Sequence, residues 1–511
     1  MTTSREAFHL TCELDASISP DAFRAAFPER GASSFVLEGG GAPSTNPQLD
    51  RAAFMGAAPI ATFRARRTAA RDGLGRTLAD VVVERTRGRR DAWSAIDPFT
   101  ALRDFVSANA VPRDVFDGRL PFPFRGGLVG YIGYECGQML ERLPCIARPS
   151  VGMPDMAFAL HRWVIATSRT TGKSWLSVIG VGPDRATARQ DAELTRDHVL
   201  RALDARGSAA LRANANAKTR RPFRVEAGLS ATEYMDRVTS AKDHIAAGDA
   251  FEICLTNALR APLARDQAWL LFDELRRSNP APFAAFLDLP EGTIVSSSPE
   301  RFLSLDAHGI AESRPIKGTR PRGATPEDDA RLARELASSE KDRAENAMIV
   351  DLVRNDLGRV CRYGTVEAPD LFAVEPYATV HQLVSTVRGE LDADKDAIDL
   401  LRATFPPGSM TGAPKIEAMS ILERLEPAER GVYSGALGWI DLGGAMDLSV
   451  VIRTVVVKDD TATFSVGGAI VADSDPRDEH EETVHKGRAL VSALETLSHR
   501  DELHPTIGER P

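Results

Sequence analysis

Lys317 is the residue whose type and surroundings give this chain its clearest chemical potential. It lies in the run 314–319, Arg-Pro-Ile-Lys-Gly-Thr. Pro315 fixes its own φ, and Gly318 permits a tight turn that brings backbone N–H groups close to a ligand. Such a lysine is either an ordinary surface residue beside a turn or a partly desolvated nucleophile, whose pKa falls from about 10.4 toward neutrality. The other polar residues along the chain favour the nucleophile.

A loop that leads into a helix is expected around Ser409. The run 405–408 is Phe-Pro-Pro-Gly, and Pro414 follows shortly after it. Apolar residues then recur at helical spacing, at Ile416, Met419, Leu422 and Leu425. Pro414 suits the first helical position, and free N–H groups at a helix start attract anions such as a substrate carboxylate. The segment is therefore either an anion-binding loop or a well-capped structural helix.

Acidic residues at two other places could hold a cation. The segment after Pro476 has the composition of a helix start, and Glu479, Glu482 and Lys486 then share one face. Carboxylates three residues apart repel each other, so this pair is either solvated or held together by a cation. Glu345 lies on a largely apolar helix face and needs a partner there. Mg²⁺ would supply one, because it binds one or two protein carboxylates together with water and substrate oxygens.

These residues belong to a longer pattern, through which the chain resembles the chorismate-utilising enzymes. The matching segments are Ser298 to Phe302, Arg314 to Thr319, Ala344 to Asn346, Asp351 to Asp356, Leu383 to Thr386, Gly408 to Lys415, Tyr433 to Ala436, Ile452 to Thr454, Gly467 to Gly468, and Glu479 to Lys486. The resemblance implies an α+β fold, a two-sheet β-sandwich flanked by helices, like the chorismate-binding fold of anthranilate synthase component I. It also implies an enzyme that acts on chorismate, with Mg²⁺ as its cofactor.

The resemblance assigns a role to each matching polar residue. Glu345 and Glu482 match Mg²⁺ ligands, and Glu479 lies close by. Lys317 matches a nucleophile, and Glu300 matches the acid that protonates the leaving hydroxyl. The matching substrate-binding positions are Gly318, Thr319, Ser409, Tyr433, Arg453, Gly467, Gly468 and Lys486. Hydroxyl, cationic and backbone N–H groups of this kind suit a dianionic ring acid.

Lys317 separates the branches of this family. The anthranilate synthases resemble the chain throughout but carry alanine at this position. In the aminodeoxychorismate branch, the lysine is proposed to attack C2 of chorismate as the 4-hydroxyl leaves, and ammonia then enters at C4. Isochorismate and salicylate synthases place a water-activating lysine where this chain has Glu252. We therefore expect component I of aminodeoxychorismate synthase, which makes 4-amino-4-deoxychorismate for para-aminobenzoate and folate synthesis. The alternatives are anthranilate synthase component I and a catalytically idle regulatory subunit.

Composition limits the partners of the chain. The chain has 511 residues and a net charge of −9, and it has no basic cluster interleaved with aromatic residues. A nucleic-acid surface is therefore not expected. No uninterrupted apolar span of membrane length occurs, so no membrane association is expected. Five widely spaced cysteines without a Cys-x-x-Cys pattern favour the reducing cytoplasm. No glutaminase pattern occurs, so ammonia is expected from a glutamine amidotransferase subunit in a heterodimer.

The chain is expected to divide into three regions. Residues 1–221 would contribute one sheet and a possible regulatory pocket, and would end in a linker at 206–221 that is rich in Ala, Asn and Arg. Residues 222–497 would form the chorismate-binding catalytic region, and 498–511 a tail. Helices are expected at 231–247 and 330–356, and strands at 293–297 and 448–457 beside the site.

Overall fold

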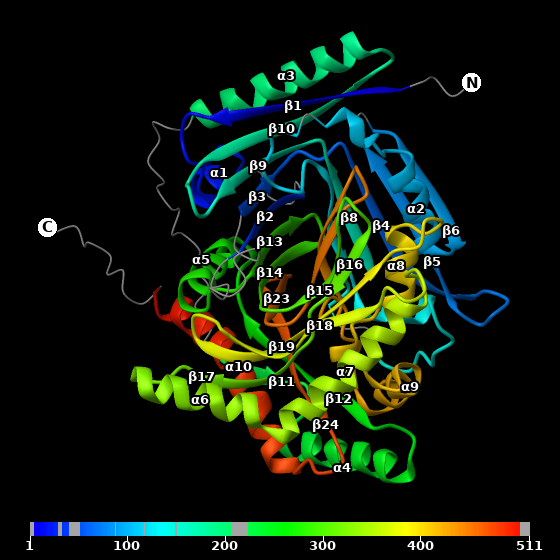
Figure 1. Ribbon diagram of the computed structural model, residues 1–511, viewed down its shortest axis with the longest axis vertical. Coiled ribbons are helices and arrows are strands. Elements are labelled where there is room, and N and C mark those ends of the chain that lie inside the picture. The colour runs from blue at the N-terminus through cyan, green and yellow to red at the C-terminus, as the bar shows by residue number, and fades with distance from the viewer. Residues whose placement is uncertain are drawn as a thin grey trace, which may run out of the picture.

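The structure is a computed structural model that describes residues 5–28, 33–39, 52–86, 88–116, 118–148, 151–205 and 223–500. Two large antiparallel sheets face each other, and helices cover their outer surfaces and edges (Figure 1). The expected α+β two-sheet sandwich is therefore confirmed. In the described ranges, no helix is both long and apolar enough to cross a membrane.

The first sheet joins strands from both halves of the chain. Its spatial order is β1 (Glu6–Leu14), β10 (Ser174–Gly182), β9 (Trp163–Ser168), β3 (Ala52–Gly56), β2 (Ser34–Glu38), β13 (Phe283–Leu289), β14 (Gly292–Ser298), β23 (Thr454–Lys458), β24 (Thr461–Ile470), β12 (Glu252–Pro262) and β11 (Glu226–Ala227), with β20 (Gly412–Ala413) paired to β12. The C-terminal strands at this end of the sheet carry several of the predicted site residues.

The second sheet also contains strands from both halves of the chain. Its order is β17 (Ile316–Pro321), β19 (Val380–Glu390), β16 (Ile310–Ser313), β15 (Arg301–Leu305), β22 (Met446–Val450), β21 (Ala436–Asp441), β7 (Gly127–Ile132), β8 (Met156–His161), β4 (Ala61–Arg71), β5 (Thr77–Arg85) and β6 (Arg90–Ile96), with β18 (Glu367–Pro376) paired to β19. Lys317 thus lies on the edge strand β17.

The expectation that residues 1–221 supply one of the two sheets is wrong. This region sends β1, β2, β3, β9 and β10 into the first sheet and β4 to β8 into the second. Strands of the C-terminal half pair directly with both sets, β13 with β2 and β21 with β7. Backbone hydrogen bonds therefore join the two halves within each sheet. The regional boundaries stay predictions, because 206–221 and 501–511 lie outside the described residues and α10 continues to Arg500.

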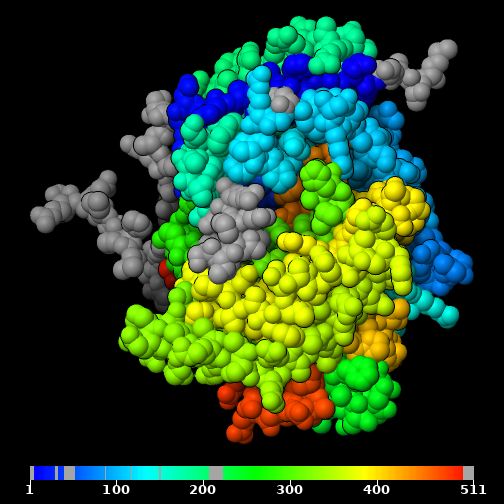
Figure 2. Space-filling view, in the orientation of Figure 1, coloured from blue at the N-terminus to red at the C-terminus, as the bar shows by residue number. Residues whose placement is uncertain are grey.

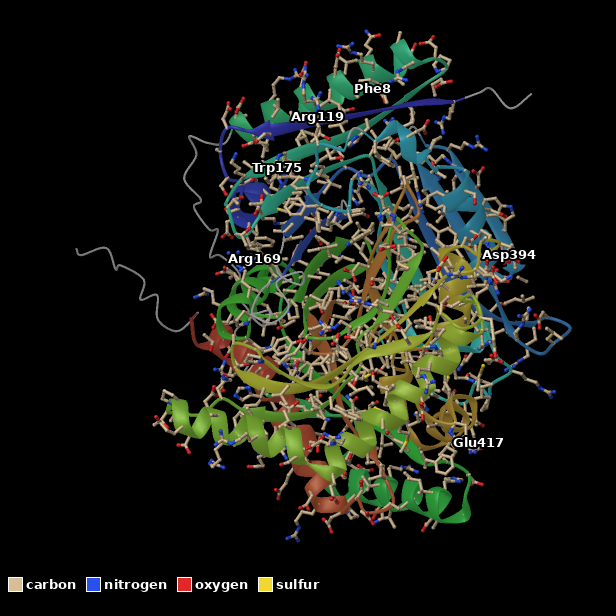
Figure 3. The ribbon with its side chains drawn as sticks, viewed as in Figure 1. Phe8, Arg119, Arg169, Trp175, Asp394 and Glu417 are labelled. Atoms are coloured by element: carbon tan, nitrogen blue, oxygen red, sulfur yellow. The ribbon has the colours of Figure 1, made fainter. Side chains whose placement is uncertain are left out.

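Ten helices of the described chain surround the sheets. They are α1 (Pro20–Ala26), α2 (Pro98–Ser107), α3 (Arg185–Asp204), α4 (Ala231–Ala247), α5 (Ala268–Ser278), α6 (Pro326–Ser338), α7 (Glu340–Gly358), α8 (Ala397–Thr404), α9 (Lys415–Leu425) and α10 (Pro476–Arg500). Figure 1 shows α3 over β1 and β10 at one end, with α4 and α9 at the other. Figure 3 shows the same separation through Phe8 of β1 and Glu417 of α9.

Local sequence explains why one of the two expected helices is confirmed and the other is divided. The predicted helix 231–247 is confirmed as α4, which begins at a Ser230–Glu233 capping box and ends at Gly248 in the left-handed region. The predicted helix 330–356 is instead two helices, α6 and α7. Ser339 separates them, because its side chain accepts a hydrogen bond from the Asp342 N–H and caps α7. The break gives α7 its own direction.

Aromatic residues fill the space between the sheets. Phe124 stacks on Trp439 with ring centroids 4.9 Å apart, and Phe35, Val129 and Tyr131 belong to the same buried cluster. A cavity of about 500 Å³ adjoins this core. It opens on the face shown in Figure 2, between the N-terminal strands and the β16 to β19 region.

Candidate active site

A β-bulge directs Lys317 toward the interior. On β17, Ile316 pairs with Val384 of β19, but the next paired residue is Thr319, which lies opposite Gln382. Lys317 and Gly318 occupy the resulting irregularity, and Gly318 adopts φ of +89°. A bulge re-aims the side chains beside it and needs a residue that tolerates such a backbone. The Lys317 side chain is consequently only 11% exposed, although it comes from an edge strand.

Glu252 is the direct partner of Lys317. It is the first residue of β12, its side chain is wholly buried, and its Oε1 lies 2.6 Å from Lys317 Nζ. Burial alone would lower the pKa of Lys317, but the Glu252 carboxylate raises it, with help from Glu345. The net shift is upward, so Lys317 does not show the lowered pKa of the partly desolvated nucleophile that was one of the two alternatives.

Sequence reasoning missed this pairing. It treated Glu252 only as the absence of a water-activating lysine. The available signal was the position of a carboxylate at the head of the apolar strand Ile253-Cys254-Leu255, where a buried charge requires a partner.

Glu300 lies in the turn between β14 and β15 and is 5% exposed. Burial raises the pKa of its carboxyl to about 7, while a hydrogen bond from Ser409 and the nearby charge of Lys317 partly oppose the rise. A carboxyl with a pKa near neutrality carries a proton in a large fraction of molecules at pH 7 and can donate it. Glu300 therefore has the protonation behaviour of a general acid, beside the amine of Lys317.

Arg453 supplies an interior cation near Glu300. It precedes β23 in a left-handed conformation with φ of +50°, and its carbonyl accepts a hydrogen bond from the Ser297 N–H. The predicted strand 448–457 is therefore interrupted at 451–453 and becomes β22 and β23. Burial lowers the pKa of Arg453, and Glu300 opposes that shift. Since no carboxylate among the described residues forms an ion pair with Arg453, its guanidinium is able to bind a substrate anion.

Two further carboxylates from other elements lie near Lys317, and a third, Glu479, lies beside one of them. Glu345 comes from α7 and Glu482 from α10, and both interact electrostatically with the Lys317 ammonium. Glu479 is buried, and its Oε1 accepts a hydrogen bond from Ser474. Its Oε2 is buried without a hydrogen-bond partner among the described residues.

Gly468 provides room for these acidic groups. A Cβ at this position of β24 would lie 2.8 Å from Glu479 Oε2 and 3.9 Å from Glu482 Oε1. Within the described ranges, no three acidic, His or Cys side chains are gathered closely enough to hold a metal by themselves. The arrangement fits Mg²⁺, which needs only one or two protein carboxylates when water and substrate complete its shell.

Lys486 and Gly467 border the same acidic region. Lys486 Nζ lies 2.6 Å from Glu482 Oε1 and donates to the Gly467 carbonyl at 3.0 Å. A Cβ on Gly467 would meet the Leu255 carbonyl at 2.4 Å, so glycine permits the close pairing of β24 and β12. Lys486 is half exposed and lies one helical turn after Glu482.

The remaining predicted residues differ in their placement. Tyr433 is buried, and its hydroxyl lies near Cys254, on the strand that begins with Glu252. Gly318 faces Asp342 of α7, and Thr319 is exposed on β17. The structure therefore groups most of the predicted residues around Lys317 and Glu300, but it leaves the Thr319 side chain outside that group.

Arg430 is a second residue that sequence reasoning missed. It is buried, forms an ion pair with Glu426 at 2.7 Å, and donates to the carbonyl groups of Met410 and Cys254, both at 2.6 Å. It thereby joins the loop that carries Ser409 to the strand that carries Glu252. The buried charge in this arrangement is compensated by several hydrogen bonds, as a stable interior ion requires.

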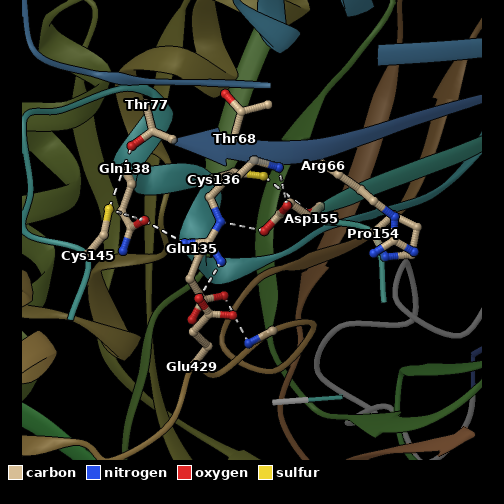
Figure 4. A network of polar contacts seen from close by, with 12 residues as sticks. Arg66, Thr68, Thr77, Glu135, Cys136, Gln138, Cys145, Pro154, Asp155 and Glu429 are labelled. Carbon is tan, nitrogen blue, oxygen red and sulfur yellow. Dashed lines mark hydrogen bonds and ion pairs between the residues drawn. The ribbon is translucent and has the colours of Figure 1, made fainter. Parts of the chain in front are cut away.

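A polar network supports Arg430 from the N-terminal half. Glu135 accepts hydrogen bonds from the backbone N–H groups of Arg430 and Gly431, at 2.6 and 2.9 Å. Burial raises the pKa of Glu135 to about 8, although Arg67 opposes the shift. Figure 4 shows Glu135 beside Glu429, within a network that also contains Asp155. Both halves of the chain therefore position the site.

Comparison with known proteins identifies the class. The family described as chorismate binding enzyme matches residues 45–492, so the chain belongs to the chorismate-binding enzyme family. The chain is 45% identical to an aminodeoxychorismate synthase of Streptomyces pristinaespiralis over 412 residues, which cover 78% of this chain and 54% of that protein. The chain thus spans about half the length of that relative.

Two other relatives, which match this chain over more than three quarters of their own length, are named as two different enzymes. The chain is 40% identical to aminodeoxychorismate synthase component 1 of Salmonella typhimurium, over 73% of this chain and 78% of that protein. It is also 40% identical to anthranilate synthase component 1 of Streptomyces coelicolor, over 78% and 77%. The structure of anthranilate synthase component I from Streptococcus pneumoniae superposes with a TM-score of 0.69 at 28% identity, covering 86% of this chain and 92% of that one.

Proposed function

We propose that this protein is component I of an aminodeoxychorismate synthase, which aminates chorismate at C4 to give 4-amino-4-deoxychorismate. The observation that carries the proposal is the buried amine of Lys317, placed among carboxylates and close to the proton donor Glu300. Once it has lost its proton, an amine in this position is able to form a covalent bond with the substrate, which divides one difficult substitution into two easier steps.

The chemistry assigns separate roles to Lys317 and Glu300. After losing its proton, Lys317 Nζ attacks C2 of the ring, both conjugated ring double bonds shift by one position, and the C4–O bond breaks. Glu300 donates its proton to the departing hydroxyl, which leaves as water. Ammonia then attacks C4, and the Lys317 amine leaves C2 as the double bonds shift back. The nitrogen is thereby directed to C4, because the lysine is still bonded to C2 when ammonia attacks.

Other residues bind and orient the dianionic substrate. Arg453 and Lys486 provide positive charge, and Tyr433 and Ser409 provide hydroxyl groups. Gly467 and Gly468 bring the backbone of β24 close to the substrate. The carboxylates that would hold Mg²⁺ are Glu345 and Glu482, with Glu479 close by. Bound Mg²⁺ would supply positive charge against a substrate carboxylate.

Ammonia is proposed to come from a glutamine amidotransferase subunit that forms a heterodimer with this chain in the cytoplasm. The naming of the Salmonella relative as component 1 supports a partner component. The product would then serve para-aminobenzoate and folate synthesis.

Anthranilate synthase component I is the second candidate, because a relative of that name is 40% identical over 78% of the chain. Lys317 distinguishes the two, since the resemblance places alanine at this position in the anthranilate synthases. The purified protein should be incubated with chorismate, Mg²⁺ and ammonia, and the products separated and weighed by mass spectrometry. 4-Amino-4-deoxychorismate supports the proposal, anthranilate supports the second candidate, and unchanged chorismate supports an idle regulatory subunit.

A further inference from the structure

We propose that Glu252 is the catalytic base of this reaction and takes from Lys317 the proton that its amine must lose before it attacks the ring. The inference rests on the proposed C4 amination and extends it to a residue with no assigned role. Its foundation is the contact between Glu252 Oε1 and Lys317 Nζ at 2.6 Å, within a pair whose acidic member is wholly buried.

The proton has one direct route away from Lys317. Among the described residues, Glu252 Oε1 is the hydrogen-bond acceptor that Lys317 Nζ contacts. Glu300 is unsuited to this task, because it has to arrive at the same step with a proton to donate. The Cys254 thiol is also unsuited, because burial raises its pKa and keeps it protonated. Glu252 remains as the group that both touches the ammonium and is able to accept its proton.

Burial makes the transfer within this pair feasible. Glu252 Oε2 has no hydrogen-bond partner among the described residues, so the charge of this carboxylate depends chiefly on Lys317. Moving one proton from Nζ to the carboxylate turns two buried charges into two buried neutral groups. Because both partners become neutral, the transfer leaves no isolated buried ion behind. The interior also penalises charged groups more than neutral groups of the same size.

The proton balance closes over one turnover. Glu252 accepts a proton from the Lys317 ammonium, and the neutral amine bonds to C2 while the C4–O bond breaks. Glu300 protonates the departing hydroxyl, so the amine bonded to C2 carries the positive charge. Ammonia then forms the C4–N bond, and Lys317 leaves as a neutral amine. Glu252 returns the proton to Lys317, and Glu300 regains one from the new C4 ammonium group.

Two isosteric pairs test Glu252: wild type with Glu252→Gln, and Glu252→Asp with Glu252→Asn. Glu252→Gln keeps the size and a hydrogen-bond acceptor but cannot take a proton. It should lower the rate of C4 amination at least about 100-fold, the smaller end of what general base catalysis contributes. The rate of Lys317 adduct formation, measured by intact-protein mass spectrometry without ammonia, should fall to the same extent. Chorismate binding should change little.

The second pair separates acid chemistry from shape. Glu252→Asp shortens the side chain but keeps an acid, and Glu252→Asn has the same short shape without one. We expect Asp to be more active than both Asn and Gln. If Glu252 only fills space and orients Lys317, the isosteric Gln variant would be the most active of the three, and the proposal would be overturned. The Asp–Asn comparison remains decisive if the Gln variant does not fold.

A control variant tests the loss of a buried carboxylate elsewhere in the first sheet. Asp288 of β13 is buried and pairs with Arg265 at 3.0 Å, so Asp288→Asn should keep the wild-type product rate. Wild-type enzyme that releases no 4-amino-4-deoxychorismate would contradict the proposed function itself. Wild-type enzyme that makes this product, together with a Glu252→Gln variant of equal rate, would contradict the role of Glu252 alone.

Discussion

Glu300 and Lys317 are both buried, but different neighbours shift the pKa of each side chain. Burial raises the pKa of Glu300 to about 7, because the Ser409 hydroxyl and the Lys317 charge compensate it only in part. For Lys317, the carboxylate of Glu252 outweighs burial and raises the pKa. At the residue scale, Glu300 therefore carries a proton in a large fraction of molecules at pH 7, and Lys317 is protonated as well.

The pH dependence of the rate should show the titration of Glu300. Its raised pKa means that the proton is kept up to about pH 7 and lost above it. Since the acid form is the active one, kcat/KM measured at a constant concentration of free ammonia should decrease as the pH rises above about 7. Glu300→Gln should be much slower and should lack this decrease. The same decrease in the variant would contradict the role of Glu300.

Glu345→Gln and Glu482→Gln should abolish Mg²⁺-dependent turnover while the melting temperature stays near that of wild type. Each change removes a ligand charge and keeps the side-chain volume. Activity titrated with Mg²⁺, together with thermal unfolding, measures both effects. Asp351→Asn is the matched control on α7, because the Asp351 side chain is 75% exposed. Wild-type Mg²⁺ dependence in either glutamine variant would contradict the ligand assignment.

The bulge in β17 is the element that converts an edge strand into part of an interior site. Gly318 permits it through its φ of +89° and its close approach to Asp342. The strand alone would direct its side chains alternately to the two faces of the sheet. The irregular pairing to β19 instead leaves Lys317 and Gly318 unpaired between Ile316 and Thr319.

Gly318→Ala should therefore reduce both stability and activity. A left-handed backbone costs a residue with a Cβ about 1–2 kcal/mol, and this Cβ would lie 2.9 Å from Asp342 Cβ. Gly309→Ala is the control, because Gly309 has φ of +85° but no atom within 4 Å of such a Cβ. Denaturant unfolding and product rate should show a stability loss in both variants but a rate loss in Gly318→Ala alone. Equal rates would contradict the positioning role of the bulge.

Sequence predicted elements well where their determinants are local. The capping residues of α4 lie beside it in the chain, and its bounds were predicted correctly. The interruption before β23 was missed, because the left-handed conformation of Arg453 depends on long-range contacts such as the Ser297 N–H to Arg453 carbonyl hydrogen bond. Glu252 and Lys317 are far apart in sequence, so their contact was equally inaccessible to a reading of local patterns.

The whole molecule is held together by sheets that neither half of the chain completes alone. Motif resemblance predicted the sandwich, but it assigned one sheet to the N-terminal region. The pairing of β2 with β13 and of β7 with β21 shows that both sheets cross the boundary between the halves. The Glu135 contacts to the backbone of Arg430 and Gly431 extend this dependence to the site itself.

The nitrogen source tests the proposed assembly. With glutamine as the only donor, the isolated chain should form no product, because glutamine hydrolysis is assigned to the partner. With ammonia at mildly alkaline pH it should act on chorismate, because more of the ammonia is then unprotonated. Both reactions are followed by product chromatography, with added amidotransferase as the positive control. Strong glutamine-dependent activity in the single chain would contradict the need for a partner.

The most direct test of the central claim is the product and the adduct of Lys317→Ala beside those of wild type. The wild-type protein should release 4-amino-4-deoxychorismate and little anthranilate, and it should show a covalent chorismate-derived mass on Lys317. The variant lacks both the nucleophile and the group that shields C2. We expect a large loss of C4 amination, no adduct, and residual amination that moves toward C2. A variant that makes the C4 product at the wild-type rate would contradict covalent catalysis by Lys317, and wild-type release of anthranilate would contradict the proposed function.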